Sequence, residues 1–188
     1  MPKESVEKLL ASAIEQVYDT TMFTGGSSAN KLNSDGDSAA ATPDAVEANS
    51  EGSAELDELV GIAAQRCRLD HRESVLLAEI AQSDLCDRLH GHTPNAWYAD
   101  RTRQARSAAS ARMRTAQRLH ARYGELADAL ETGVIGWQHV GVFDRAANSR
   151  VRAAMIELLP ALIDLAQVAG FERWAREVRG IAQRLDQD

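Results

Sequence analysis

One stretch of this 188-residue sequence is rich in arginine and contains no acid. Residues 101–122, RTRQARSAASARMRTAQRLHAR, hold seven arginines and neither Asp nor Glu, although the formal net charge of the chain is −7. A guanidinium group is a planar donor that binds phosphate or carboxylate through paired hydrogen bonds. The chemistry that this stretch offers is therefore the binding of an anionic partner.

If the stretch is a helix, its two sides differ. At about 100° per residue, one face is small or apolar and is expected to be buried: Ala105, Ala109, Met113, Ala116 and Leu119, with Tyr123 continuing it. The other half carries the residues that we predict to bind nucleic acid: Arg103, Arg106, Ser110, Arg114, Gln117, Arg118 and Arg122. Arginines at i,i+4 spacing repel one another and oppose helix formation. Because no acid in this stretch offsets the repulsion, the row of arginines indicates an anionic partner, and DNA is the commonest such partner.

Two other interpretations of the arginine row stay open. It could bind an acidic protein surface, including the acidic N-terminal segment of this chain, or it could simply be solvated. Arg112 is an exception to the row, because the same helical spacing points it into the apolar side. A guanidinium buried without a partner is costly, so we predict a structural ion pair between Arg112 and Asp100, Asp84 or Glu79.

No set of residues in the sequence has the spacing of a catalytic site. The histidines are His71, His90, His92, His120 and His139, and no Cys or acidic ligand lies at a zinc-like spacing around the pair His90 and His92. Cys67 and Cys86 are interpreted as small apolar fillers, and no glycine-rich phosphate loop is present. We therefore expect no catalytic residue, no metal and no cofactor in this chain, and lean towards a protein that is not an enzyme.

The pattern of apolar residues predicts an all-α fold with three parts. Residues 1–18 contain an amphipathic helix, with Val6, Leu9, Leu10, Ala13, Ile14 and Val17 on one face. Residues 19–53 are rich in Gly, Ser, Asn and Asp and are expected to be a disordered acidic linker. Residues 54–188 are predicted to form a multi-helix bundle, which opens with a long helix from Ser53 to a break near residues 89–92.

Local signals predict the later helices of the bundle. Thr93 and Pro94 are an N-cap and a first-turn proline, which start a short helix before a turn at residues 103–105. That helix, the turn and the arginine stretch have the layout of a helix-turn-helix. Gly133 is expected to end the next helix, and Pro160 to kink or split a helix over residues 150–168. A last helix is expected over residues 171–185.

The sequence also bears on location and assembly. Its longest apolar runs are shorter than the roughly 20 residues that a membrane-spanning helix needs, and its N-terminus lacks the apolar run of a secretory signal. We expect a cytoplasmic protein with no membrane partner. The first helix could dock on its own domain or on another chain, so a homodimer through this helix stays open.

Several segments together resemble a known family. They are LLAEI at 76–80, HGHTPNAWYADRT at 90–102, ARMRTAQRL at 111–119, LADALETGVIGWQHVGVFDRA at 126–146 and the closing REVRGIAQRLDQD. These segments resemble domain of unknown function 222 (DUF222), the thirteen-E-twelve (13E12) repeat family of actinobacteria. The resemblance implies a helical domain that usually precedes an HNH endonuclease domain, in which histidine and asparagine bind a divalent metal. Here Ala105 stands where a capping Ser is common, and the sequence ends at Asp188, where that nuclease domain would begin.

The function that we predict is that of a DNA-binding helical module of an HNH-endonuclease-associated family, without a catalytic centre in this chain. Its expected partners are double-stranded DNA and an HNH nuclease encoded nearby. Two alternatives remain. One is an interaction or dimerisation bundle whose arginine face binds an acidic partner, and the other is an inactive remnant of a truncated nuclease.

Overall fold

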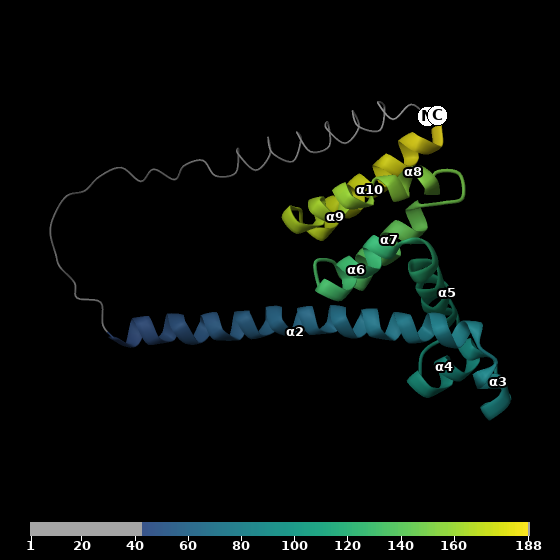
Figure 1. The fold of residues 1–188 in the computed structure, drawn as a ribbon. Coiled ribbons are helices and arrows are strands. Elements are labelled where there is room, and N and C mark those ends of the chain that lie inside the picture. The colour runs from purple at the N-terminus through teal and green to yellow at the C-terminus, as the bar shows by residue number, and fades with distance from the viewer. Residues whose placement is uncertain (1–42, 188) are drawn as a thin grey trace.

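The computed structural model describes residues 43–187, with side chains from Ser53 onward. Nine helices and no strand are found in this part of the chain (Figure 1), which confirms the all-α expectation. The helices are α2 (Pro43–Gln82), α3 (Leu85–His90), α4 (Pro94–Thr102), α5 (Arg106–Arg122), α6 (Gly124–Thr132), α7 (Trp137–Ala146), α8 (Arg152–Glu157), α9 (Leu159–Val168) and α10 (Phe171–Gln187). The helix expected within residues 1–18, and the linker up to residue 42, lie outside the described residues.

Both ends of α2 differ from the expected long helix. α2 begins at Pro43 rather than Ser53, so residues 43–53 are helical and not part of a linker. Proline suits the first helical position because its fixed φ is helical and its missing N–H would have no partner there. α2 ends at Gln82 instead of continuing to residues 89–92, and α3 follows as a separate short helix that Gly91 ends in the left-handed region at φ +64°.

The long helix α2 packs on the domain only with its C-terminal half. Its contacts are mainly with α5 and α6, and fewer with α4 and α7. The N-terminal half extends beyond the other helices (Figure 1), and every side chain from Ser53 to Ala63 is exposed. A helix of 40 residues is about 60 Å long, so α2 is much longer than the face that the domain covers.

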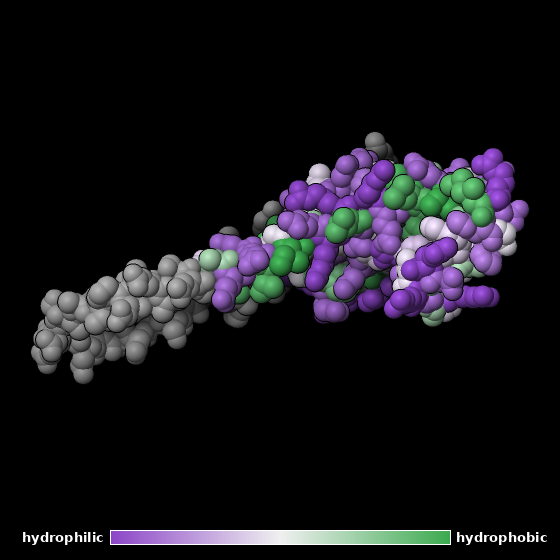
Figure 2. All heavy atoms as spheres, turned by 90° about the horizontal axis from the view of Figure 1, so that it is seen from below, coloured by the Kyte–Doolittle hydropathy of each residue, from purple (hydrophilic) through white to green (hydrophobic). Residues whose placement is uncertain are grey.

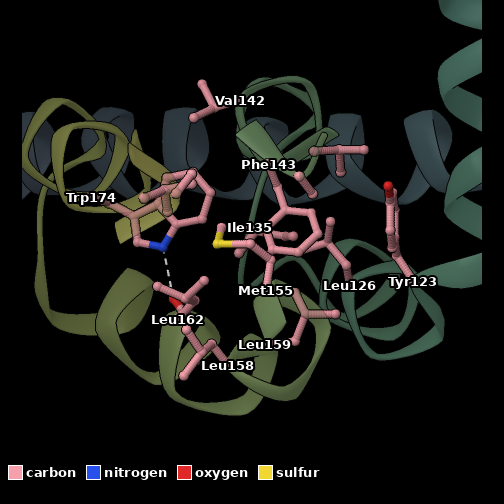
Figure 3. Packing of buried hydrophobic residues seen from close by; sticks show 14 of the residues in the cluster. Tyr123, Leu126, Ile135, Val142, Phe143, Met155, Leu158, Leu159, Leu162 and Trp174 are labelled. Atoms are coloured by element: carbon pink, nitrogen blue, oxygen red, sulfur yellow. Dashed lines mark hydrogen bonds between the residues drawn. The ribbon is translucent and has the colours of Figure 1, made fainter. Parts of the chain in front are cut away.

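Two apolar clusters hold the helices together. The larger cluster joins α6 to α10 with the end of α5, around fully buried Tyr123, Phe143 and Trp174 (Figure 3). The Trp174 indole N–H donates to the Leu162 carbonyl over 2.7 Å, which satisfies the polar atom of that ring. The smaller cluster joins α2, α4 and α5 through Leu77, Tyr98, Ala99, Ala109, Met113 and Ala116. Because α5 belongs to both clusters, its orientation is fixed from two sides.

Two expected helix breaks are confirmed. The segment over residues 150–168 is divided into α8 and α9 at Leu158, with Pro160 in the first turn of α9. Gly133 ends α6 at φ +81°, a conformation that favours glycine because it has no Cβ.

Helices α4 and α5 follow each other across a short turn, in the order that the helix-turn-helix expectation requires. Arg103 connects the two helices at φ +56°, where its backbone N–H bonds to Asp100 and the N–H of Gln104 bonds to Ala99. Among the described residues Arg103 is the only non-glycine residue with positive φ. Such a conformation costs an arginine about 1 kcal/mol relative to glycine.

Candidate nucleic-acid interface

Helix α5 buries almost the whole face that the sequence predicts to be buried. Ala109, Met113, Ala116 and Leu119 are buried, and Tyr123 continues the face at the end of the helix. Ala105 is the exception, because it occupies the N-cap position in extended conformation and is exposed. The opposite face of α5 is therefore directed away from both apolar clusters.

Four of the predicted arginines form an exposed group at α5 and the turn before it. Arg103, Arg106, Arg114 and Arg122 are exposed, and none makes an ion pair with an acid in the described part of the chain. We call these four residues the arginine surface. The exposed side chains between them are small, namely Ser107, Ala108, Ala111 and Ala121. Helical spacing alone places these small residues among the arginines.

Arg118 was predicted to face an anionic ligand, but in the structure its guanidinium binds an acid of the same chain. Its Nε and Nη2 each donate over 2.5 Å to the carboxylate of Asp144 on α7. The Asp144 side chain is 4% exposed and also accepts from Thr115 Oγ1 over 2.9 Å. This hydrogen bonding raises the pKa of Arg118 above its ordinary value. The expectation that no carboxylate neutralises this face of α5 is therefore wrong at Arg118.

Arg112 forms ion pairs with Asp70 and Glu73 of α2. The ion pair is present, but the predicted partners Asp100, Asp84 and Glu79 are wrong. The Arg112 side chain is 20% exposed, its Nε donates to Glu73 over 2.8 Å, and its guanidinium lies 4.4 Å from the centre of the Trp137 ring. Burial alone would lower the pKa of Arg112, but its hydrogen bonds and the two negative charges raise it. Arg112 thus links α5 to α2 and α7.

Ser110 and Gln117 lie at the edge of the arginine surface. Both are half-buried, and the Ser110 hydroxyl accepts a hydrogen bond from Asn95 Nδ2 over 2.9 Å. Together with Arg114 they line an open hollow of about 230 Å³ between α4 and α5. A larger open cleft of about 400 Å³ lies at the turn and is lined by Arg103, Arg106, His92, Asp100 and Gln104 among others. The two hollows place polar donors on both sides of the N-terminal half of α5.

The contact between Ser74 and His120 resembles part of a catalytic dyad, but its hydrogen bonds are directed the wrong way. Ser74 Oγ donates to the His71 carbonyl over 2.7 Å, so His120 Nε2, 2.8 Å away, must donate to that oxygen. Burial and the nearby His71 lower the pKa of His120. A histidine that donates to a serine does not activate it as a nucleophile. Within the described residues, no three His, Cys, Asp or Glu side chains are grouped so that they could hold a metal.

His139 provides a prediction about pH. It is half-buried against Phe171 and Trp174, and its Nδ1 accepts from the Gly136 backbone N–H over 3.2 Å. Burial lowers its pKa, so the unfolded chain takes up a proton near pH 6.5 before the folded protein does. The contribution of neutral His139 to the free energy of unfolding is therefore fully present above about pH 6.5 and decreases as the pH falls below that value.

We expect this loss to be smaller in His139→Gln, which keeps an acceptor for Gly136 but does not titrate. Urea unfolding at about pH 7.5 and pH 5.5 should show the variant losing less than the parent, by at most about 1 kcal/mol. The exposed His92→Gln is the matched control and should keep the parent's pH dependence. An unchanged pH dependence in His139→Gln would contradict the assignment.

The geometry defines an all-α domain with a helix-turn-helix-like centre whose second helix presents arginines to solvent. The chain belongs to the DUF222 family, because the family described as "Domain of unknown function (DUF222)" matches residues 56–188. No curated protein and no solved structure gave a significant match to the chain. Among the described residues, no helix is both long and apolar enough to cross a lipid bilayer.

Proposed function

We propose that the chain is a DNA-binding module that contacts duplex DNA through the arginine surface and acts beside an HNH nuclease encoded nearby. The observation that carries the proposal is the absence of an ion pair at Arg103, Arg106, Arg114 and Arg122 within the described residues. Nearby Arg112 and Arg118 do have carboxylate partners. Four arginines that are not neutralised by an ion pair attract a polyanion such as DNA.

The shape of α5 also supports contact with DNA. In a helix-turn-helix the second helix enters the major groove and approaches the bases with its N-terminal residues. The exposed Ser107, Ala108 and Ala111 are small enough to let the backbone of α5 come close to a groove, while Arg106 and Arg114 reach outward. Arg103 adds a cation at the turn despite its strained backbone. Strain that persists at one position is often associated with function.

The proposal is tested by measuring affinity for a duplex of about 25 base pairs by fluorescence anisotropy at several salt concentrations. Four phosphate contacts predict a slope of log affinity against log salt of roughly −3.6. Changing Arg106, Arg114 and Arg122 together to Ala should reduce the slope to roughly −1 and lower the affinity at low salt at least about tenfold.

The control is a second triple variant with the same change in net charge. Arg176, Arg179 and Arg184 are exposed on α10, away from the arginine surface, and changing them to Ala should leave most of the affinity. Equal losses in the two variants would show only a general charge effect and would contradict the proposed surface. If the parent binds an acidic peptide such as polyglutamate but not DNA, the surface serves a protein partner instead.

A further inference from the structure

The apolar stripe with which α2 packs on the domain continues past the end of the domain. Within the domain this stripe includes Cys67, Ser74, Leu77 and Ala78, which are buried or half-buried. At about 100° per residue, the same side of the helix continues to Leu56, Leu59, Val60 and Ala63. These four residues, which we call the uncovered stripe, are exposed, by 65% at Leu56, 63% at Leu59 and 70% at Val60.

Another exposed apolar residue, Val134, lies near the end of the uncovered stripe that is closest to the domain. Gly133, after α6, lies against Ala64, since a Cβ at Gly133 would be 3.8 Å from the Ala64 backbone. The next residue, Val134, is 38% exposed. The α6–α7 turn therefore lies against α2 at the point where the extending half of α2 begins.

Within the described part of the chain, no other helix covers this apolar face of α2. Most of the stability of a protein helix comes from packing of its apolar face, not from its intrinsic propensity. Hydrophobic side chains are visible at the surface of the extending part of α2 (Figure 2). A row of large apolar residues that continues an internal packing face is suited to receive another helix.

We propose that residues 5–18 of the same chain dock on the uncovered stripe as an antiparallel helix. Their sequence provides a matching apolar face, Val6, Leu9, Leu10, Ala13, Ile14 and Val17. The lengths also match, because the uncovered stripe from Leu56 to Ala63 and the segment from Leu10 to Val17 as a helix each span about 11 Å. In this arrangement Val17 lies opposite Leu56, and Ala13 lies opposite Val60.

The length of the connecting chain fits the antiparallel direction. Residues 19–42 join the two segments, and a coil of this length has an end-to-end distance of about 27 Å. Leu56 lies about 20 Å along α2 from Pro43, whereas a parallel helix would require about 36 Å. A tether of this kind gives an effective concentration in the millimolar range, which favours the segment of the same chain over a separate molecule.

Charge disfavours a second copy of α2 as the occupant. Glu55, Asp57 and Glu58 border the uncovered stripe, and a second α2 would bring the same three acids to the contact. Residues 5–18 carry only Glu7, Lys8 and Glu15. Their net charge is close to zero, so the repulsion is smaller.

Amide hydrogen exchange on the full chain tests the docking from both sides. We expect amides in residues 5–18 to be protected, and Val60→Asp to reduce that protection at least about tenfold. Reciprocally, Ile14→Asp should reduce the protection of α2 amides before Ala63. Leu69→Asp is the matched control, because Leu69 is 69% exposed on another side of α2, and it should change neither region. Absent protection of residues 5–18, or protection unaffected by Val60→Asp, overturns the proposal.

Disulfide trapping identifies the occupant. With Cys67 changed to Ser, Ala13→Cys and Val60→Cys should form a disulfide under mild oxidation within one chain, at the mass of a monomer. A disulfide-linked dimer would show that the segment comes from a second copy and would overturn docking within the chain. No disulfide between these positions would overturn the antiparallel register.

Discussion

Replacing Arg118 with Ala should lower the free energy of unfolding by about 3 kcal/mol, since the buried carboxylate of Asp144 loses its cationic partner. The Asp144 carboxylate, 4% exposed, accepts two hydrogen bonds of 2.5 Å from Arg118 and one of 2.9 Å from Thr115. In the variant only the Thr115 hydroxyl remains for a charge that has almost no access to water. The cost is that of an uncompensated buried carboxylate, more than the loss of the attraction itself.

Urea unfolding of three variants separates this explanation from a general effect of losing charge. Arg114→Ala removes an exposed arginine one turn earlier on α5 and should change stability by less than about 0.5 kcal/mol. The double variant Arg118→Ala with Asp144→Ala should recover part of the loss, because no charge is then left buried. A loss in Arg118→Ala no larger than that in Arg114→Ala would mean that Asp144 is stabilised without its guanidinium partner.

The side of α5 on which Arg118 lies could be predicted from the sequence, but its partner could not. Helical periodicity places Arg118 on the outward half of α5, and it does lie there, half-buried at the edge. Its partner Asp144 is 26 residues away on α7, and no local pattern relates the two positions. Helical periodicity gives the side of a helix on which a residue lies. A long arginine side chain can still reach a neighbouring helix, and the position of that helix depends on tertiary packing.

Features that depend on neighbouring residues in the sequence could be predicted better than the partner of Arg118. The buried residues of α5 and α10 follow from a 3-4 spacing of apolar side chains, and the ends at Gly133 and Pro160 follow from backbone restrictions. The start of α2 also had a local signal, because TPD at residues 42–44 has the same Thr-Pro order as Thr93 and Pro94. The high Gly, Ser and Asn content of the preceding segment hides this signal, because it is typical of a linker.

The arginine surface depends both on helical periodicity and on tertiary packing. Exposure of Arg106, Arg114 and Arg122 follows from the helical period, since the opposite face is apolar. The lack of ion pairs at these three arginines is a property of the folded chain, because Asp or Glu from another helix could have packed against them, as Asp144 does at Arg118. The proposal of DNA binding therefore rests on three-dimensional neighbours more than on the number of arginines in residues 101–122.

Arg112 should contribute to stability as much as Arg118, through a different set of contacts. Arg112→Ala is expected to lower the free energy of unfolding by about 3 kcal/mol, because Asp70 and Glu73 would lie near each other without their shared cation. Both carboxylates are partly exposed, 29% and 36%, so water offsets some of the cost. The contact with Trp137 at 4.4 Å adds a cation–π attraction that is lost as well.

Conservative variants distinguish a specific role of the guanidinium from that of any cation or any long side chain. Arg112→Lys keeps the charge but cannot reproduce the Nε bond to Glu73 together with the planar contact on Trp137, so it should lose about 1–2 kcal/mol. Arg112→Met keeps the length without charge and should resemble Arg112→Ala. Urea unfolding followed by tryptophan fluorescence measures all three. If Arg112→Met is as stable as the parent, the two carboxylates do not need a cation, and the pairing of α2 with α5 depends on apolar packing alone.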